Sequence, residues 1–332
     1  MKTACVTGIT GQTGSYLAEV LLSAGYKVYG LKRRSSSFNT SRLDHIYQDL
    51  HVSDQLELVY GDLSDYSSIA SLVADTKPEL FFNLGAQSHV RVSFDIPENT
   101  FDADATGVLR ALEAIRKHSP STRFLQASSS EMFGSTPPPQ NEQTLFHPRS
   151  PYAVAKVAGF WSTVNYREAY GLETFNAISF NHESPRRGET FVTRKITRAA
   201  TRIKLGLQDK LYLGNLDAKR DWSHAKDVAR AMLMIISSDK SDDYVVASGS
   251  MYSVKEFLQL VFSKLDLDWK EYVEIDHKYF RPSEVDALCG DPSKLKKATG
   301  WEPLYSFDTL VDEMVSEDMK LAQKEKLVKD NS

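Results

Sequence analysis

The first 180 residues alternate between short apolar runs and longer stretches in which apolar residues recur every three to four positions. Short apolar runs bounded by glycine or polar residues predict β-strands, whereas the longer period predicts amphipathic helices. Alternation of this kind is typical of a parallel sheet with helices on both faces. The strands are predicted at residues 3–8, 27–32, 56–61, 80–85, 123–128 and 173–179. The helices are predicted at Ser15–Ala24, Ser64–Val73, Thr100–Lys117 and Tyr152–Tyr170.

After Ser179 the pattern becomes irregular. Residues 181–191, NHESPRRGETF, lack an apolar period and are predicted to form a loop. The elements predicted next are a basic amphipathic helix at 192–206, a short strand at 210–215, and a helix and strand at 224–236 and 243–249 that rejoin the sheet. The final residues 321–332, LAQKEKLVKDNS, are predicted to be a fraying, solvated end.

Three glycines lie between the first predicted strand and the first predicted helix, in the segment TGITGQTG. Gly8 permits a tight turn, Gly11 lets the backbone approach a pyrophosphate, and Gly14 allows close packing of helix on strand. The helix N-terminus also offers unpaired N–H groups and a favourable dipole to an anion. Glycines at this position indicate a dinucleotide cofactor and a Rossmann-type α/β fold with a doubly wound parallel sheet. The two predicted domains are a cofactor domain of residues 1–180 plus about 221–250, and a smaller, mixed α/β substrate domain of residues 181–220 plus about 251–332.

The end of the second predicted strand distinguishes NAD from NADP. NAD-binding proteins of this fold usually carry an acidic residue there, which accepts a hydrogen bond from the ribose 2′-hydroxyl. This chain instead has Lys32, Arg33 and Arg34, and a guanidinium presents a planar fork suited to a phosphate. The segment favours NADP, although a basic solvated turn would have the same composition. Later strand ends supply further candidate contacts, with Asp62 at the adenine edge and with Leu84, Ala86 and Ser88 near the ribose, the nicotinamide and the substrate.

Tyr152 and Lys156 are spaced i, i+4 and therefore share one face of a predicted helix. A phenol has an unperturbed pKa of about 10. A nearby ammonium and an oxidised nicotinamide both favour the phenolate, so we expect Tyr152 to act as a base near neutral pH. Lys156 can also donate to the nicotinamide ribose, and Ser129 would share the substrate hydroxyl with Tyr152. Without the glycine loop upstream, the same spacing would describe an ordinary surface pair.

The stretch QASSSEMFG places three hydroxyls and the carboxylate of Glu131 at the end of a predicted buried strand. Ligands of such sheets bind beyond the carboxyl ends of the strands. The stretch is therefore either a polar transition from strand to loop or a row of catalytic groups, and its position alone does not separate the two.

Composition excludes several classes of function. A net charge of −4 and an isoelectric point near 6.1 give no electrostatic reason to expect nucleic acid or acidic membranes as partners. The two cysteines, Cys5 and Cys289, are far apart, which favours a reducing compartment. With no apolar run near 18 residues and no room for a signal peptide before the first strand, we expect a cytoplasmic protein. We expect no metal site, and we interpret His89, His182 and His224 as structural.

The chain resembles the extended short-chain dehydrogenase/reductase superfamily and, within it, the GDP-mannose 4,6-dehydratase family. The similarity runs through nearly the whole length and includes VTGITGQTGSYLAE, RRSSSFNTSRLDH, PRSPYAVAK and RDWSHAKDV. Asn181–Ile196 and Tyr279–Asp291 are the most specific segments, because other nucleotide-sugar enzymes differ there. The resemblance implies NADP as cofactor, GDP-mannose as substrate, and a homo-tetramer or homo-dimer. It also implies a redox-neutral hydro-lyase, in which hydride passes from C4 of the sugar to NADP and returns to C6 after water is lost.

The resemblance gives a role to Glu131. Sugar dehydratases of this superfamily carry a carboxylate two residues after the hydroxyl of the catalytic triad, and Glu131 matches that place, where it would remove the C5 proton. The implied catalytic residues are Ser129, Glu131, Tyr152 and Lys156. The implied cofactor contacts are Gly8, Thr10, Gly11, Gln12, Gly14, Arg33, Arg34, Asp62, Leu63, Leu84, Ala86, Ser88, Tyr152 and Lys156. The implied substrate contacts are Ser88, Asn181, Glu183, Val192, Lys195, Leu213, Gly214, Arg220, Arg281 and Glu284.

Two positions depart from the family pattern. Ser129 stands where the family usually has threonine, so the hydroxyl remains but the stiffness of a β-branched side chain is lost. Thr13 replaces the usual aspartate of the glycine loop and removes one negative charge beside the cofactor site. Two alternative functions stay open: a nucleotide-sugar epimerase or reductase of the same superfamily, against which Glu131 argues, and a catalytically silent NADP-sensing protein, against which the intact catalytic set argues.

Overall fold

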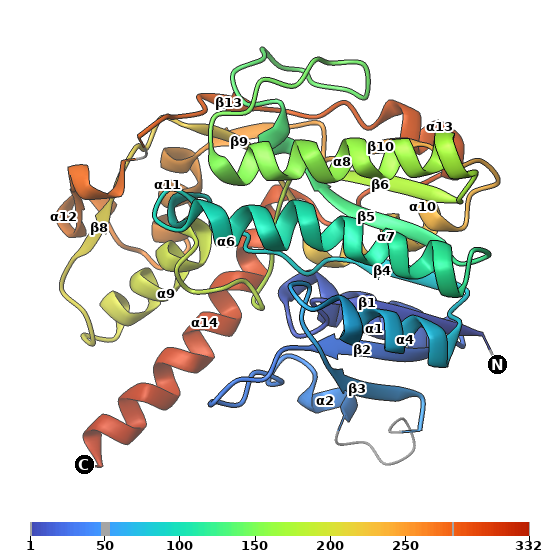
Figure 1. The fold of residues 1–332 in the computed structure, drawn as a ribbon. Helices are drawn as coiled ribbons and strands as arrows, with labels where there is room; N and C mark the ends of the chain where they lie inside the picture. The colour runs from blue at the N-terminus through green and yellow to red at the C-terminus, as the bar shows by residue number, and fades with distance from the viewer. Residues whose placement is uncertain (1, 48–53, 281, 332) are drawn as a thin grey trace.

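A seven-stranded sheet lies at the centre of the computed structural model, which describes residues 2–47, 54–280 and 282–331 (Figure 1). Neighbouring strands pair in parallel in the order β10-β6-β5-β4-β1-β2-β3. The strands are β1 (Thr3–Thr7), β2 (Lys27–Lys32), β3 (Leu56–Tyr60), β4 (Leu80–Asn83), β5 (Arg123–Ser129), β6 (Thr174–Ser179) and β10 (Asp243–Val246). The predicted parallel sheet is confirmed, including the return of the chain to it through β10.

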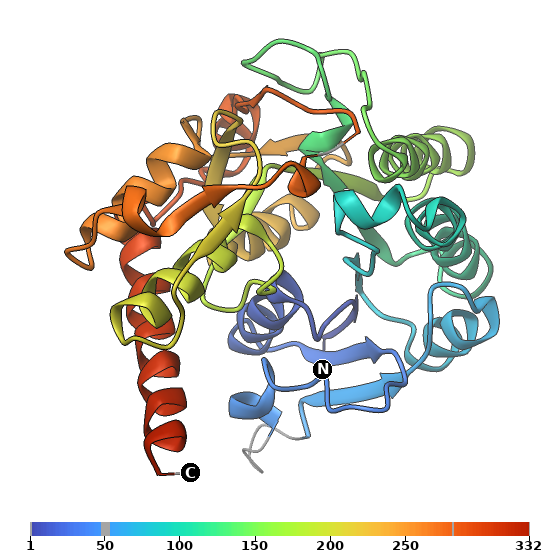
Figure 2. The same cartoon turned by 90° about the vertical axis from the view of Figure 1, so that its left-hand side faces the viewer.

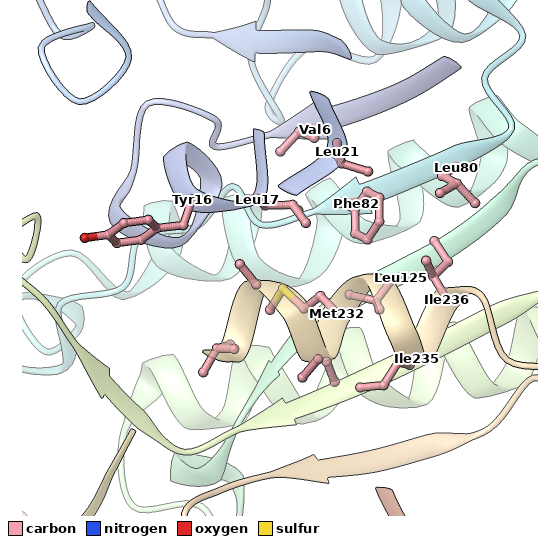
Figure 3. Close-up of a cluster of buried hydrophobic side chains, with 14 of the residues drawn as sticks. Val6, Tyr16, Leu17, Leu21, Leu80, Phe82, Leu125, Met232, Ile235 and Ile236 are labelled. Carbon is pink, nitrogen blue, oxygen red and sulfur yellow. The ribbon is translucent and has the colours of Figure 1, made fainter. Parts of the chain in front are cut away.

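Helices cover both faces of this sheet, because its central strands are apolar on both sides. Successive side chains of a strand point to opposite faces, so Phe82 of β4 packs in one layer and Phe81 in the other. Figure 3 shows Leu17, Phe82 and Met232 in the first of these layers, between the sheet, α1 and α10. That layer contains α1 (Gln12–Ser23) and α10 (Ala225–Ile236), and the other contains α4 (Tyr66–Thr76), α7 (Gly107–His118) and α8 (Pro151–Tyr170).

The strand order reverses at β1, which lies between β2 on one side and β4 on the other. The connections after β1 and β4 therefore leave the sheet in opposite directions and open a crevice at the carboxyl edge, where ligands of this fold bind. The loops that follow β1, β4 and β5 all meet this edge. As a result, residues 8–14, 84–88 and 129–131 come together although they are far apart in the sequence.

Apart from α10, β10 and α13 (Ser293–Thr299), the elements after β6 form smaller sheets and helices around a second hydrophobic core, which includes Trp222, Phe257, Phe262 and Met314. In Figure 2 these yellow, orange and red segments lie on the side of the molecule opposite the teal and green helices of the large sheet. We call this group the small lobe. Its elements are β7 (Asn181–Glu183), α9 (Val192–Lys204), β8 (Leu211–Leu213), β9 (Lys219–His224), β11 (Met251–Ser253), α11 (Val254–Ser263), β12 (Val273–Ile275), β13 (Ala287–Leu288) and α14 (Phe307–Asp330).

Short elements complete the structure. They are α2 (Asp44–Tyr47), α5 (Val90–Ser93), α6 (Pro97–Phe101), the π-helical turn η1 (Asp102–Thr106), the 3₁₀ turns η2 (Ser130–Met132) and η3 (His277–Tyr279), α12 (Trp269–Tyr272) and α13 (Ser293–Thr299). The single helix predicted at 100–117 is therefore divided into α6, η1 and α7. Among the described residues, no helix is both long enough and apolar enough to cross a bilayer.

Two predictions of local structure are wrong. The predicted loop at 181–191 begins with strand β7, which pairs in parallel with β9. The predicted fraying end at 321–332 is helical to Asp330. The helix continues because Ala322 is fully buried and Glu325 forms ion pairs with both Arg198 and Arg202 of α9, contacts that the charged composition of the segment does not reveal.

Candidate active site

The glycine loop joins β1 to α1 in a conformation that only glycine accommodates at two positions. Gly8 has a φ of +67°, and a Cβ there would lie 2.8 Å from the backbone nitrogen of Gly85. A Cβ on Gly14 would lie 2.3 Å from the carbonyl oxygen of Gly8. Gly11 is the N-cap of α1 and adds no side chain there. The first turn of α1 therefore presents bare backbone N–H groups at the carboxyl edge of the sheet, as an anion site requires.

A cleft of about 1460 Å³ extends from this loop across the carboxyl edge of the sheet to the small lobe. The structure brings almost all of the predicted site residues to its walls. Those that line it are Gly8, Thr10, Gly11, Gln12, Gly14, Arg33, Asp62, Leu63, Leu84, Ala86, Ser88, Ser129, Glu131, Tyr152, Lys156, Asn181, Glu183, Val192, Lys195, Leu213, Gly214, Arg220 and Glu284. Arg34 is exposed and is not among the described residues that line the cleft. Arg281 lies outside the described residues.

Ser129, Glu131, Tyr152 and Lys156 converge in the middle of this cleft. Ser129 is the last residue of β5, and its hydroxyl accepts a hydrogen bond from the backbone N–H of Glu131 at 3.2 Å. Tyr152 and Lys156 lie in the first turns of α8, whose N-terminus is capped by the Ser150 side chain. All four residues are buried. A strand end and a capped helix thus hold one polar row on rigid backbone.

The electrostatics of Tyr152 differ from the sequence-based expectation. Burial raises the pKa of Tyr152 above its usual value, and the negative charge of Asp104 raises it further. A hydrogen bond with Ser129 and the positive charge of Arg187 oppose this rise. The ammonium of Lys156 donates to the Ala127 carbonyl at 3.0 Å and lies 5.7 Å from the centroid of the Tyr152 ring. The protein alone therefore holds Tyr152 as a phenol, because burial and Asp104 outweigh the hydrogen bond with Ser129 and the positive charge of Arg187.

Asp104 is a residue of this site that the sequence analysis did not select. It is buried in the turn η1, where one carboxylate oxygen accepts from the backbone N–H of Gln87 at 2.7 Å. Its second oxygen has no hydrogen-bond partner among the described residues. Burial raises the pKa of Asp104 to about 6, although the positive charge of Lys156 lowers it. One signal was available: Asp104 continues the buried face of α7, four and eight residues before Val108 and Leu112.

The end of the cleft beside β2 and the glycine loop is partly basic. Arg33 lines it from the end of β2, as predicted. Arg42, which the sequence analysis did not select, also lines the cleft and donates to the carbonyl oxygens of Thr10 at 3.3 Å and Arg186 at 2.7 Å. Asp62 accepts hydrogen bonds at 2.9 Å from the backbone N–H and the hydroxyl of Ser64. Arg33 thus presents a guanidinium to the cleft, whereas Arg42 holds the glycine loop.

The small lobe forms the other wall, and its charged side chains already have protein partners. Lys195 donates to the Tyr212 carbonyl at 2.6 Å, and its ammonium lies 3.6 Å from the centroid of the Tyr279 ring. Arg220 donates to the Val285 carbonyl at 2.9 Å. Glu183 is buried and accepts from the hydroxyl of Thr193 at 2.6 Å. A ligand that contacts these groups has to share or replace such bonds.

The three histidines each hold backbone or side chains in place. His89 caps α5, and His224 lies 3.0 Å from the carboxylate of Glu313. His182 is bonded to the hydroxyl of Thr13. The described part of the chain contains no group of three or more histidine, cysteine or carboxylate side chains that could hold a metal ion.

The chain also matches known proteins over nearly its whole length. A family model described as GDP-mannose 4,6 dehydratase matches residues 5–314. The chain is 58% identical to GDP-mannose 4,6 dehydratase 1 of Arabidopsis thaliana, with 99% of this chain and 93% of the relative covered. It is 52% identical to GDP-mannose 4,6-dehydratase of Yersinia enterocolitica, with 100% of this chain and 97% of the relative covered.

Solved structures share the fold at lower identity. A dTDP-glucose 4,6-dehydratase from Bacillus anthracis, in complex with NAD, matches with a TM-score of 0.84 and 21% identity, covering 97% of this chain and 98% of that one. RMD from Pseudomonas aeruginosa, complexed with NADPH, matches with a TM-score of 0.80 and 25% identity, covering 97% of this chain and 100% of that one. The fold, the match of the family model and the full-length relatives agree, and the chain belongs to the GDP-mannose 4,6-dehydratase family.

Proposed function

We propose that this protein converts GDP-mannose to GDP-4-keto-6-deoxymannose by the loss of one water molecule. The observation that carries the proposal is the buried row in which Glu131 follows Ser129 by two residues and lies in the same cleft as Tyr152. A hydroxyl, a phenol and a carboxylate in one cleft provide separate groups for chemistry at C4 and for chemistry at C5 and C6 of a hexose. An epimerase would not need the carboxylate.

The chain's own residues divide the proton transfers between them. The positive charge of an oxidised nicotinamide beside Tyr152 would favour its phenolate. In that form Tyr152 would take the proton of the C4 hydroxyl, while Ser129 holds that hydroxyl by a hydrogen bond. Once C4 is a ketone, the neighbouring C5 proton is acidic, and Glu131 removes it as a general base. The protonated Glu131 then donates to the C6 hydroxyl, which leaves as water. NADP held in the cleft would supply the hydride acceptor for C4 and the hydride donor for C6. Uptake of one proton at C5, equivalent to the proton that Tyr152 took from the C4 hydroxyl, would complete the reaction with the cofactor unchanged.

We assign the cofactor as NADP within the nicotinamide dinucleotides that this fold accepts. Arg33 supports the assignment, because it lies at the end of β2 on the wall of the cleft and offers a planar fork to a 2′-phosphate. The end of β2 also lacks the acidic residue that would accept from a free 2′-hydroxyl. Arg34 remains a weaker candidate, since it does not reach the cleft wall.

We place the nucleotide sugar against the small lobe, which we propose is the substrate domain. Lys195 and Arg220 lie on its cleft wall with Glu284 and would take the diphosphate and a ribose hydroxyl. Gly214 permits the close approach of Tyr279, whose carbonyl oxygen would lie 2.9 Å from a Cβ at that position. Arg281 is assigned to the same ligand by family resemblance alone.

We further propose that the chain forms a homo-dimer or a higher homo-oligomer. The support is a group of apolar side chains on α6, α7 and α8, each between 40% and 56% exposed: Phe101, Leu109, Val154 and Trp161. An exposed group of this kind is typical of an interaction surface. Because both cysteines are free thiols, we place the protein in the reducing cytoplasm.

The reaction is tested by supplying GDP-mannose without added NADP and identifying the product by mass spectrometry and NMR. We expect a 4-keto-6-deoxy sugar nucleotide, 18 mass units lighter than the substrate, in many equivalents per enzyme. Consumption of one external nicotinamide per turnover would show a net oxidoreductase instead. Recovery of a C4 epimer without loss of water would show an epimerase.

A further inference from the structure

The glycine loop and strand β7 are joined side chain to side chain across 169 residues of sequence. The hydroxyl of Thr13 lies 2.8 Å from Nε2 of His182. His182 is the middle residue of β7, between the candidate substrate residues Asn181 and Glu183. Since side chains alternate along a strand, His182 turns to the glycine loop while its two neighbours turn the other way. One short strand therefore contacts both halves of the site.

The polarity of this bond follows from the other nitrogen of the ring. Nδ1 of His182 lies 2.8 Å from the Phe180 carbonyl oxygen, which can only accept, so Nδ1 carries the proton. Burial and the positive charge of Arg187 lower the pKa of His182 to about 4, so the ring is neutral near pH 7. Nε2 is then an acceptor, and the Thr13 hydroxyl is the donor.

Two more hydrogen bonds lie beside the bond between Thr13 and His182. The side-chain amide of Gln12 donates to the His182 carbonyl at 3.0 Å. The hydroxyl of Ser184 donates to the carbonyl of the Gln12 side chain at 2.7 Å. Two consecutive residues of the glycine loop therefore hold β7 by the ring and the backbone of the same histidine.

We propose that Thr13 is a positioning residue that acts through His182 to fix strand β7 against the glycine loop. The inference rests on the proposed function, because it assumes that Asn181 and Glu183 contact the sugar nucleotide. A loop and a strand that are already held in their binding positions need less ordering when a ligand binds, so the ligand binds more tightly. A bond that sets the spacing between the cofactor loop and the substrate strand therefore controls how well both ligands are held together.

The proposal also accounts for the departure at residue 13. The family usually carries aspartate at this position, and a carboxylate can only accept a hydrogen bond. With Nδ1 committed to the Phe180 carbonyl, a carboxylate would need a second proton on the His182 ring. A threonine hydroxyl makes the same connection to a neutral ring.

The test is Thr13→Val, which keeps the β-branched shape and removes only the donor. We expect the KM for GDP-mannose to rise roughly 5- to 30-fold, the effect of leaving the half-buried Nε2 of His182 without its donor. The fraction of protein purified with bound NADP should also fall, while kcat at saturating substrate and cofactor changes less than threefold. Thr13→Ser, which restores the hydroxyl, should recover the parent values.

Thr201→Val is the matched control. Its hydroxyl donates only to the Thr197 and Arg198 carbonyls within α9, away from the cleft lining. A parent-like KM and NADP content in Thr13→Val would overturn the proposal, and so would equal changes in the control. A lower melting temperature with unchanged kinetics would reduce Thr13 to a structural role and overturn it as well.

Failure of the proposed function, and failure of the variant to fold, can each be told apart from failure of this proposal. If the parent protein makes no 4-keto-6-deoxy product, the proposed function fails, and the NADP content of Thr13→Val still tests the connection itself. If Thr13→Val does not fold, Ser184→Ala removes the flanking bond to Gln12 from outside the glycine loop. That variant should raise the KM for GDP-mannose in the same direction, and no change in it would count against the proposal.

Discussion

The two walls of the cleft are built in different ways. The cofactor wall consists mainly of backbone, with Gly8 and Gly14 admitting no side chain and α1 presenting unpaired N–H groups. The small-lobe wall consists of long charged side chains, and Lys195 and Arg220 already donate to carbonyl oxygens of the protein. A backbone wall is complete before its ligand arrives. A side-chain wall has to exchange hydrogen bonds on binding, so its net gain per contact is smaller.

The largest expected effect lies where the two walls meet, at Glu131. Glu131→Gln keeps the shape of the side chain but removes the proton acceptor. Elimination should fall by roughly 10²- to 10⁴-fold, the usual cost of losing a positioned acid or base. Hydride transfer from C4 should survive, because Ser129, Tyr152 and Lys156 are unchanged. Mixing the variant with GDP-mannose in deuterated water should therefore accumulate reduced nicotinamide with little deuterium at C5.

Tyr152→Phe is the control for this experiment, since it should stop the reaction before any reduced nicotinamide appears. Exchange at C5 and product formation at nearly the parent rate in Glu131→Gln would make the carboxylate a bystander. The catalytic groups would then all lie on the cofactor wall, and the place where the two walls meet would have no catalytic role.

The next effect concerns Arg33, a long cationic side chain on the cofactor wall. Arg33→Ala should weaken NADP binding by about 1.5–3 kcal/mol, or roughly 10- to 150-fold, and leave NAD binding almost unchanged. Arg34→Ala is the matched control, because Arg34 does not line the cleft and should show a much smaller change. Titration of both variants with each dinucleotide would measure the difference. Equal losses for NADP and NAD would remove Arg33 from the 2′-phosphate.

Asp104 allows a test by pH. Burial raises the pKa of Asp104 to about 6 in the folded protein. The free energy of unfolding should therefore fall as the pH rises from 4 through 6, because the buried carboxyl then loses its proton. Asp104→Asn removes this loss, and we expect it to be more stable than the parent at pH 7 by about 1–3 kcal/mol, with the gap closing toward pH 4. Thermal unfolding across this range measures the gap. Asp102→Asn, at the partly exposed ion pair with Arg110, should not show the same trend.

The smallest effect is expected on the small-lobe wall. Lys195→Met removes the ammonium and keeps the length of the side chain. Because Lys195 would give up its bond to the Tyr212 carbonyl when it binds a phosphate, the KM for GDP-mannose should rise only about 3- to 10-fold. Copurification of NADP should not change. A rise above 100-fold in steady-state assays would show that this wall, too, is complete before its ligand arrives.

The sequence allowed the cofactor wall to be predicted in detail, because each of its contributions is local. Gly8 and Gly14 follow directly from the positions of the first strand and helix, and Tyr152 and Lys156 share a helical face. Features that depend on distant partners were missed. Strand β7 exists because Asn181 pairs with Trp222 of β9, far along the chain, whereas its own polar residues resemble a loop. Asp104 was overlooked because its burial depends on the packing of η1 against α8, which the local sequence does not reveal.

Side-chain direction set the second limit on prediction. The segment Lys32–Arg34 offers three basic residues in a row, and only the structure separates Arg33 from Arg34 at the cleft wall. The C-terminal segment was expected to fray because its own composition is charged and solvated. Its order depends on α9, where Arg198 and Arg202 provide the partners for Glu325. A partner more than 120 residues away in the sequence cannot be inferred from the local pattern of residues.

The hydrogen bonds that hold the glycine loop to β7 involve only neutral groups at neutral pH. The bonds that hold the end of α14 to α9 are ion pairs at the protein surface. Dissolved salt screens charges over a distance of about 8 Å at physiological ionic strength and over about 3 Å at 1 M. Concentrated salt should therefore release the last turns of α14 well before it disturbs the spacing between the cofactor loop and the substrate strand. Concentrated salt should thus weaken the contacts between α14 and α9 more than those between the glycine loop and β7.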